Sequence, residues 1–273
     1  MQPLILLTND DGIRSPGLMA VAEAVCDLGE LLIVAPATQQ TGMGRGSPPV
    51  TGGPVSEELL SVRCESLVSY ALAGSPAQAV IYGVLVLAPR RPDLVISGIN
   101  YGENLGTSVT VSGTVGAALQ AAELGIPGLA ISMETTREYH YTHGTDVDWR
   151  VAAQSARYFA QVVLRQQLPP DVDVLKIDVP ADATSHTPWR ITRQARQPYY
   201  EIFRAAEQPE DVEHVRLDYS INVRWDQLAK DTDIYAFAHD RLISVTPLSQ
   251  DLTSRTAFDA LDCLLRQDSA VPG

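Results

Sequence analysis

Two adjacent carboxylates, Asp10 and Asp11, follow an apolar run at residues 4–8 and precede Gly12. The run is long enough for a buried strand, and in an open α/β sheet the residues after such a strand lie at the carboxyl edge, where ligands bind. Two neighbouring carboxylates repel each other unless a cation lies between them. The pair therefore predicts a hard-metal site, although Asn, Asp and Gly are also common turn residues.

Three further groups of oxygen-bearing residues border other predicted elements. Residues 39–42 follow a second strand, Asn100 and Asn104 lie in a glycine-rich segment after a third strand, and Ser112, Gly113 and Thr114 begin a helix. A helix start offers free backbone N–H groups and the positive end of the dipole to an anion; a plain N-cap is the alternative.

The chemistry of these residues favours a hard cation. No His or Cys is placed among them, which favours Mg²⁺, Mn²⁺ or Ca²⁺ over zinc. A hard cation beside an anion-binding helix start indicates metal-assisted hydrolysis of a phosphate ester.

The elements that must position these residues follow a β-α-β rhythm. Several strands are apolar without alternation, as expected for a parallel sheet that is buried on both faces. Strands are expected at residues 4–8, 31–35, 93–97, 128–132, 172–179 and 243–248, and helices at 17–28, 77–88, 112–125, 151–168 and 256–266. Residues 55–72 read as short strands in an antiparallel excursion. The fold class predicted is a doubly wound, mostly parallel α/β sheet.

One domain over residues 1–273 is the better interpretation, because no internal repeat and no linker is evident. Its core is expected to span about residues 1–180. A polar stretch of about 181–240 is expected to form an extended arm or a hairpin that reaches a neighbouring subunit. A closing strand and helix are expected at about 241–268.

Composition excludes several classes of protein. With 45% hydrophobic and 19% charged residues among 273, the chain is globular, and its net charge of −13 argues against binding to a nucleic-acid duplex. No apolar segment approaches the roughly 18 residues that span a membrane, and the N-terminus resembles no signal peptide. Cys26, Cys64 and Cys263 are typical of reduced, buried thiols. We expect a cytoplasmic protein that acts on a small molecule.

Several motifs resemble those of the SurE family of survival-protein nucleotidases. They lie at residues 8–12 with 15–17, 34–36, 97–106, 112–115, 232–233 and 245–248. The resemblance implies a Rossmann-like core and an acid-phosphatase-like phosphoric monoester hydrolase, a divalent-metal 5′- or 3′-nucleotidase of nucleoside monophosphates. It also implies a homodimer or homotetramer assembled through an exchanged C-terminal segment.

The same motif matches assign candidate site residues. Those expected to bind one divalent cation are Asp10, Asp11, Thr41 and Asn100, and the two acids are also the candidate catalytic residues. Those expected to hold the substrate phosphate are Asn9, Asn104, Ser112, Gly113 and Thr114. Asp10 is the better candidate to assist proton transfer.

Two departures from the family pattern bear on activity. Gln40 stands where the family usually has Arg, and Gln78 stands where it commonly has an acid. Arg45 is a candidate to replace the missing cation. These departures motivate an alternative, a homologue that binds metal or nucleotide with little or no catalysis.

Other interpretations are weaker or open. An NAD-dependent oxidoreductase shares the β-α-β start but would need a glycine fingerprint after the first strand, which is missing. His140 and His143 are expected in a solvated loop rather than at a metal. An aromatic group is expected either to stack on a base or to pack an oligomer contact: Tyr199, Tyr200 and Phe203.

Overall fold

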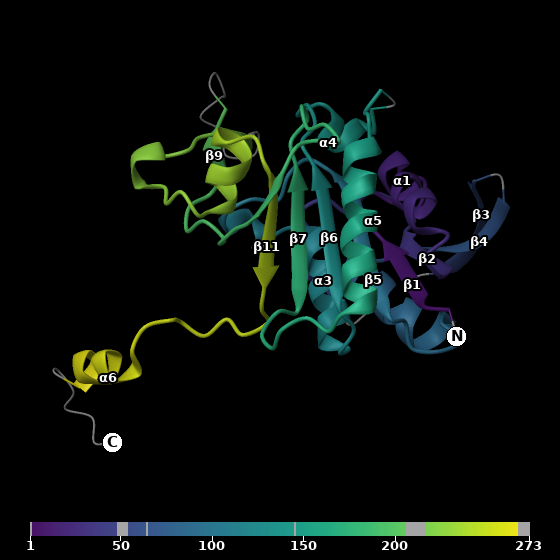
Figure 1. Ribbon diagram of the computed structural model, residues 1–273, viewed down its shortest axis with the longest axis horizontal. Helices are drawn as coiled ribbons and strands as arrows, with labels where there is room; N and C mark the ends of the chain where they lie inside the picture. Colours follow the sequence, from purple (N-terminus) through teal and green to yellow (C-terminus); the bar gives the residue numbers. More distant parts are fainter. Residues whose placement is uncertain (1, 48–53, 64, 145, 206–216, 267–273) are drawn as a thin grey trace, which may run out of the picture.

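A mixed sheet passes through the centre of the computed structural model (Figure 1), which describes residues 2–47, 54–63, 65–144, 146–205 and 217–266. Within those residues the strand order is β3-β4-β2-β1-β5-β6-β7-β11-β8. The strands are β1 Leu4–Thr8, β2 Glu30–Pro36, β3 Val55–Val62, β4 Glu65–Leu72, β5 Leu94–Tyr101, β6 Gly128–Met133, β7 Val174–Val179, β8 Trp189–Ile191 and β11 Ile243–Leu248. Strands β4, β2, β1, β5, β6 and β7 are mutually parallel, whereas β3 and β11 pair antiparallel to β4 and β7.

Helices cover both faces of this sheet because successive strand residues point to opposite sides. Ile5 and Leu7 pack with α1 (Pro16–Val25) and α5 (Arg150–Arg165) on one face. Leu4 and Leu6 pack with α2 (Pro76–Tyr82) and α3 (Gly113–Glu123) on the other. The doubly wound, Rossmann-like arrangement that the sequence predicts is therefore confirmed.

The order of the strands places the ends of β1 and β5 at a topological switch point. From β1 the chain proceeds to β2 on one side and later returns to β5 on the other side, and β1 pairs in parallel with both. Such a reversal opens a crevice at the carboxyl ends of the two strands. Residues 9–12 and 100–106 are thereby directed to the same place.

Some element boundaries differ from the prediction. Strand β5 continues to Tyr101, so Asn100 belongs to a strand and not to an irregular loop. After an irregularity between Ser97 and Asn100, the strand resumes pairing with β6 at Ser132 and Met133, and these bonds hold the segment extended despite its glycines. Helix α1 ends at Val25, before the predicted limit, and α2 passes at Tyr82 into a π-helical turn, η1 (Gly83–Leu87).

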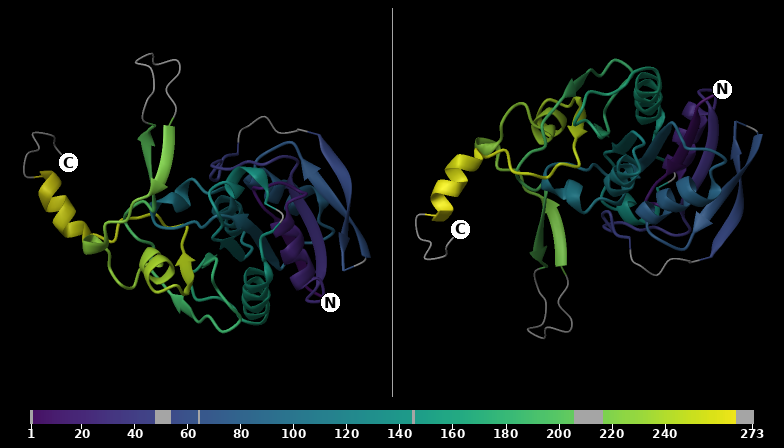
Figure 2. Two further views of the ribbon diagram at one scale, coloured as in Figure 1. Left: turned by 90° about the horizontal axis from the view of Figure 1, so that it is seen from above. Right: turned by 90° about the horizontal axis from the view of Figure 1, so that it is seen from below.

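The polar stretch after β7 forms more than an arm. Strand β8 joins the sheet beside β11, while the hairpin of β9 (Tyr200–Arg204) and β10 (Leu217–Ile221) projects from the body (Figure 2). Short helical turns complete the chain: η2 (Thr107–Thr110), α4 (Tyr139–Thr142), η4 (Trp225–Gln227) and η5 (Tyr235–His239). The division into a single domain stays a prediction.

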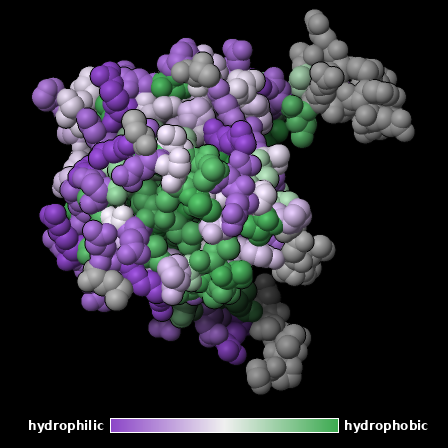
Figure 3. Space-filling view, turned by 90° about the vertical axis from the view of Figure 1, so that its right-hand side faces the viewer, coloured by the Kyte–Doolittle hydropathy of each residue, from purple (hydrophilic) through white to green (hydrophobic). Residues whose placement is uncertain are grey.

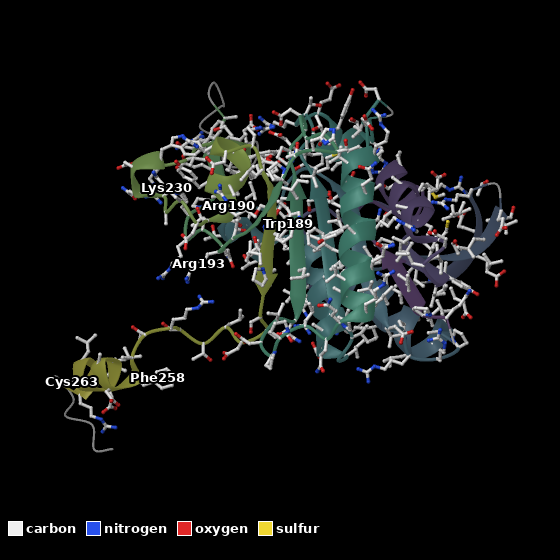
Figure 4. The ribbon with its side chains drawn as sticks, in the orientation of Figure 1. Trp189, Arg190, Arg193, Lys230, Phe258 and Cys263 are labelled. Carbon is white, nitrogen blue, oxygen red and sulfur yellow. The ribbon has the colours of Figure 1, made fainter. Side chains whose placement is uncertain are left out.

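The C-terminal helix α6 (Phe258–Arg266) lies apart from the rest of the chain (Figure 1), and both Phe258 and Cys263 lie on it (Figure 4). Cys263 is exposed and Cys26 is partly buried, so the prediction of buried thiols is wrong for Cys263, because its helix packs on nothing else that the structure describes. Cys64 lies outside the described residues.

The surface carries exposed apolar side chains away from α6 as well. An apolar area is visible on the side of the molecule where β3 and β4 lie (Figure 3), and Leu59 and Val68 of these strands are exposed. In the part of the chain that the structure describes, no helix combines the length and the apolar character needed to cross a bilayer.

Candidate active site

The turn after β1 holds both acids in the interior. The side-chain amide of Asn9 closes this turn, since its oxygen accepts from the Gly12 N–H at 3.1 Å and its nitrogen donates to the Gly12 carbonyl at 3.0 Å. Asp10 is only 3% exposed and Asp11 only 2%. Residues 9–12 are thus both a turn and the support of a buried carboxylate pair. The predicted contact of Asn9 with phosphate stays a prediction.

Asp10 lies against the N-terminus of α3. The Thr114 hydroxyl donates to Asp10 Oδ1 at 2.5 Å. Burial raises the pKa of Asp10 to about 6, although the Thr114 hydroxyl and the backbone N–H groups of Gly113 and Thr114 lower it. The Ser112 hydroxyl caps the same helix by accepting from the Val115 N–H at 3.1 Å. The start of α3 therefore already holds one anion, the carboxylate of Asp10.

The close approach of α3 to β1 depends on Gly113. A Cβ atom at this position would lie 2.7 Å from Asp10 Cβ and 2.8 Å from Asp10 Oδ2. Any larger residue would displace the carboxylate. Of the predicted phosphate-binding residues of α3, Gly113 and Thr114 thus contact Asp10, whereas Ser112 caps the helix.

Asp11 is held from the other side of the switch point. Its Oδ2 accepts from the Tyr101 N–H at 3.2 Å and its Oδ1 accepts from Gln39 Nε2 at 3.3 Å. Burial, followed by the charge of Asp10, raises the pKa of Asp11 well above its ordinary value. Two buried acids with raised pKa values favour a bound cation, because a cation would relieve both the burial of charge and the repulsion.

Gln39 connects the second loop to this pair and was not singled out from the sequence. Its amide nitrogen also donates to Thr41 Oγ1 at 2.8 Å and to the His140 carbonyl at 2.6 Å. Thr41 is exposed, but Gln39 brings its hydroxyl to the side of Asp11. In the sequence, Gln39 was named only as part of the turn at residues 39–42 and was given no role of its own.

The side-chain amide of Asn100 is held in one orientation. Its amide nitrogen donates to the carbonyls of Tyr101 at 3.2 Å and Gly102 at 2.6 Å, which fixes the orientation of the amide. Carboxylate, amide and hydroxyl oxygens suit Mg²⁺, Mn²⁺ or Ca²⁺. The described residues contain no cluster of three or more His, Cys, Asp or Glu side chains for a metal, as expected for a donor set with two acids only.

Asn104 is anchored by polar groups deeper in the molecule. Its side chain donates to Ser132 Oγ at 2.8 Å, and its backbone N–H donates to Asp178 Oδ1 at 2.7 Å. Asp178 forms a fully buried ion pair with Lys176, which also lies 3.4 Å from Asp233. This network fixes the loop that follows β5, and the sequence analysis missed it because Lys176 and Asp178 lie within an otherwise apolar strand.

Arg45 and Gln78, the two residues that bear on the departures from the family pattern, have different partners in the structure. Arg45 pairs with Glu123 at the far end of α3 and donates to Gln120 at 3.1 Å. The backbone of Arg45 lies beside Gly116, but Gln120 and Glu123 are about 10 and 15 Å along α3 from Gly113, so the guanidinium is directed away from Asp10. Gln78 forms a capping box with Ser75 at the start of α2, a role that suits Gln as well as an acid.

The histidines and aromatic residues lie differently from the prediction. His140 is buried in α4 rather than in a solvated loop, because its ring packs against Tyr200 and Tyr219. Tyr199 is buried against Phe237, and Phe203 is exposed on the hairpin. Tyr199 and Tyr200 thus meet edge to face with their ring centroids 5.1 Å apart, while Phe203 lies on the exposed hairpin. The Tyr200 hydroxyl donates to Glu103, a residue of the loop after β5.

Comparison with known proteins gives one consistent result. The family model "Survival protein SurE" matches residues 5–201. A Methanocella arvoryzae protein named 5′-nucleotidase SurE is 42% identical over 268 residues, which cover 97% of this chain and 98% of that protein. A Thermococcus gammatolerans protein of the same name is 38% identical over 276 residues, 98% of each chain.

A solved structure agrees with the sequence relatives. The crystal structure of the SurE protein from Aquifex aeolicus matches with a TM-score of 0.74 and 28% identity, over 96% of this chain and 100% of that chain. The family resemblance is therefore confirmed along nearly the whole sequence. This chain belongs to the SurE family.

Proposed function

We propose that this protein hydrolyses nucleoside monophosphates as a 5′-nucleotidase, with 3′-nucleotides as a second possible class of substrate. The observation that carries the proposal is the buried Asp10–Asp11 pair at the switch point, next to the start of α3. The names of the relatives, 5′-nucleotidase SurE, support the choice of substrate.

One divalent cation, Mg²⁺ or Mn²⁺ with Ca²⁺ as a further candidate, would be held by Asp10, Asp11, Thr41 and Asn100. All four side chains offer hard oxygen atoms, and the amide of Asn100 is oriented with its oxygen free of the neighbouring carbonyls. When bound, the cation would supply positive charge to the phosphoryl oxygens and make water a stronger acid.

The chain's own residues would orient and hold the reacting groups. Thr114 fixes Asp10, and Gln39 with the Tyr101 N–H fixes Asp11, so the carboxylates need little rearrangement. Asp10, which lies at the end of β1 against the start of α3, is the candidate to assist proton transfer. Asn9, Asn104, Ser112, Gly113 and Thr114 are the candidate phosphate-binding residues.

The test is Asp10→Asn, assayed for phosphate release from AMP with Mn²⁺ or Mg²⁺, with and without EDTA. We expect wild-type activity that EDTA abolishes, and a loss of at least about a thousandfold in the variant, since removing an essential charge costs on this order. Asp226→Asn, an exposed acid far along the chain, is the matched control and should keep full activity. Wild-type turnover by Asp10→Asn would show the site assignment to be wrong.

A second candidate is a protein that binds metal or nucleotide with little catalysis. It is favoured by one observation: Arg45, the candidate to replace the Arg that the family has at position 40, pairs with Glu123 instead. Tight binding of AMP without phosphate release, measured on the same wild-type preparation, would support this alternative and exclude the nucleotidase.

A further inference from the structure

A small cavity lies beside the candidate active site. It measures about 290 Å³ and is lined by Glu103, Glu134, Thr135, Arg137, Tyr200, Tyr219, Ser220 and Ile221. These residues come from the loop after β5, the segment between β6 and α4, and the hairpin of β9 and β10. Figure 1 shows α4 and β9 at the end of the molecule to which the arrows of β6 and β7 point.

Two buried polar atoms of the cavity lining have no hydrogen-bond partner within the described part of the chain: Glu103 Oε2 and Thr135 Oγ1. Glu103 is only 5% exposed, and its other oxygen accepts from the Tyr200 hydroxyl. Leaving a buried acceptor unpaired costs free energy, so native proteins rarely do so without a ligand or water at that place. Together these atoms provide a carboxylate acceptor and a hydroxyl group for hydrogen bonds to a ligand in the cavity.

Three other side chains of the cavity lining have planar groups. Tyr200 and Tyr219 meet edge to face with their ring centroids 5.4 Å apart. The guanidinium carbon of Arg137 lies 4.2 Å from the centroid of the Tyr219 ring. Aromatic rings and guanidinium planes are the surfaces on which proteins stack nucleobases. A ring stacked along Tyr200 would present its polar edge beside the Tyr200 hydroxyl, where Glu103 lies.

One residue joins the cavity to the carboxylate pair. His140 Nδ1 lies 3.2 Å from the Tyr219 hydroxyl, and the His140 carbonyl accepts from Gln39, which also donates to Asp11. His140 and Gln39 thus connect Tyr219 of the cavity lining to Asp11 through hydrogen bonds. A volume of about 290 Å³ is at the lower limit for small-molecule sites, and it suits a single base.

We propose that this cavity binds the base of the nucleotide substrate, with the base against the side chains of Tyr200, Tyr219 and Arg137 and its polar edge hydrogen-bonded to Glu103 and Thr135. Glu103 is then a specificity-determining residue that accepts from an N–H or amino group of the base. This inference rests on the proposed function, since it requires that the phosphate lie at Asp10 and Asp11.

The test compares AMP with ribose 5-phosphate, which has the sugar and phosphate but no base. Each is measured for kcat/KM with Mn²⁺ and, independently of turnover, for affinity by calorimetry. In Glu103→Gln, an amide nitrogen replaces one acceptor, and the preference for AMP over ribose 5-phosphate should fall about tenfold, because a donor group of the base is then left without its acceptor. Tyr219→Leu removes a wall of the cavity at a partly exposed position and should reduce the same ratio.

The controls distinguish an effect on base binding from an effect on sugar binding and from a general effect of charge. Glu138→Gln removes an exposed acid from the same segment and should keep the wild-type ratio. The 2′-deoxy form of AMP should follow AMP in every variant; if it follows ribose 5-phosphate instead, Glu103 binds the sugar and the proposal is wrong. Unchanged ratios in folded Glu103→Gln and Tyr219→Leu would also overturn it. Failure of the wild type to hydrolyse either compound would refute the nucleotidase alone, because the affinity ratios would still decide this inference.

Discussion

At the level of single residues, the protonation of Asp10 and Asp11 depends on a balance between burial and hydrogen bonding. Burial alone would favour neutral Asp10 and Asp11, whereas the Thr114 hydroxyl and the N–H of Tyr101 favour their charged forms. The result is a pair of acids with raised pKa values that still have donors directed at them. A cation would complete this arrangement, which is why the donors matter for metal affinity as well as for geometry.

Thr114→Val should weaken the site without a change in side-chain volume. It removes the donor to Asp10 Oδ1, and we expect metal affinity and kcat/KM for AMP to fall roughly tenfold or more. Thr114→Ser keeps the hydroxyl and should retain most activity. Metal titration and phosphate release measure the two effects, and equal behaviour of the Val and Ser variants would contradict the role given to the hydroxyl.

Glu103 should make stability depend on pH. Burial raises its pKa from 4.5 to about 7, although the Tyr200 hydroxyl lowers it. Because the folded state favours the neutral acid, the contribution of Glu103 to the free energy of unfolding is complete below about pH 4.5 and is lost as the pH rises through 7. Relative to Glu103→Gln, the wild type should lose at most about 3 kcal/mol between pH 4.5 and 8. Urea unfolding at both pH values measures this, and a difference that does not change with pH would refute it.

At the level of elements, the loop after β5 depends on a buried charge network contributed by β7 and by the chain before η5. Lys176, Asp178 and Asp233 are fully buried. Burial lowers the pKa of Lys176, but the two carboxylates outweigh it and raise this pKa overall. Asp233 accepts from the Gly106 and Ala195 N–H groups at 3.0 and 2.8 Å, so it joins the loop after β5 to the polar stretch after β7.

Lys176→Met should therefore be strongly destabilising. It leaves two buried carboxylates without a cation, and breaking a buried pair in this way costs about 3–5 kcal/mol. Arg150→Met breaks the exposed pair with Asp148 and should cost less than about 1 kcal/mol. Urea unfolding of both variants tests the contrast; similar losses in the two would show that the buried network contributes little.

At the level of the whole molecule, α6 carries apolar side chains that nothing else described in the structure covers. Phe258, Leu261, Leu264 and Leu265 are exposed, and the segment before the helix exposes Leu252. An amphipathic helix that lies apart from its own body (Figures 1 and 2) is suited to pack on a second copy of the chain. We therefore propose a homodimer or homotetramer that uses the C-terminal segment.

The assembly can be tested with the double variant Phe258→Asp and Leu265→Asp. We expect the wild type to sediment as a dimer or tetramer and the variant as a monomer, because charges on the apolar face oppose its burial. Asp259→Ala, on the polar face of α6, is the control and should keep the assembly. A monomeric wild type in analytical ultracentrifugation would exclude this use of α6.

The parallel sheet and the family were predictable from the sequence alone, as was the position of Asp10 and Asp11 at the end of a buried strand. Strands such as β1 and β6 are apolar without alternation, and only a sheet covered on both faces buries such strands. Asp10 and Asp11 were recognisable because charged residues directly after a buried strand are costly without a partner. Local pattern and composition are enough for inferences of this kind.

Only the tertiary structure decided what surrounds the acids. Gln39 and His140 are 101 positions apart in sequence and meet because the loop after β2 lies beside α4, just as Tyr200 meets Glu103 from 97 positions away. The extension of β5 to Asn100 depends on pairing with β6, and the destination of Arg45 depends on Glu123. Each of these contacts joins residues that are far apart in the sequence. Their energies depend on which elements become neighbours, so no local pattern in one sequence predicts them.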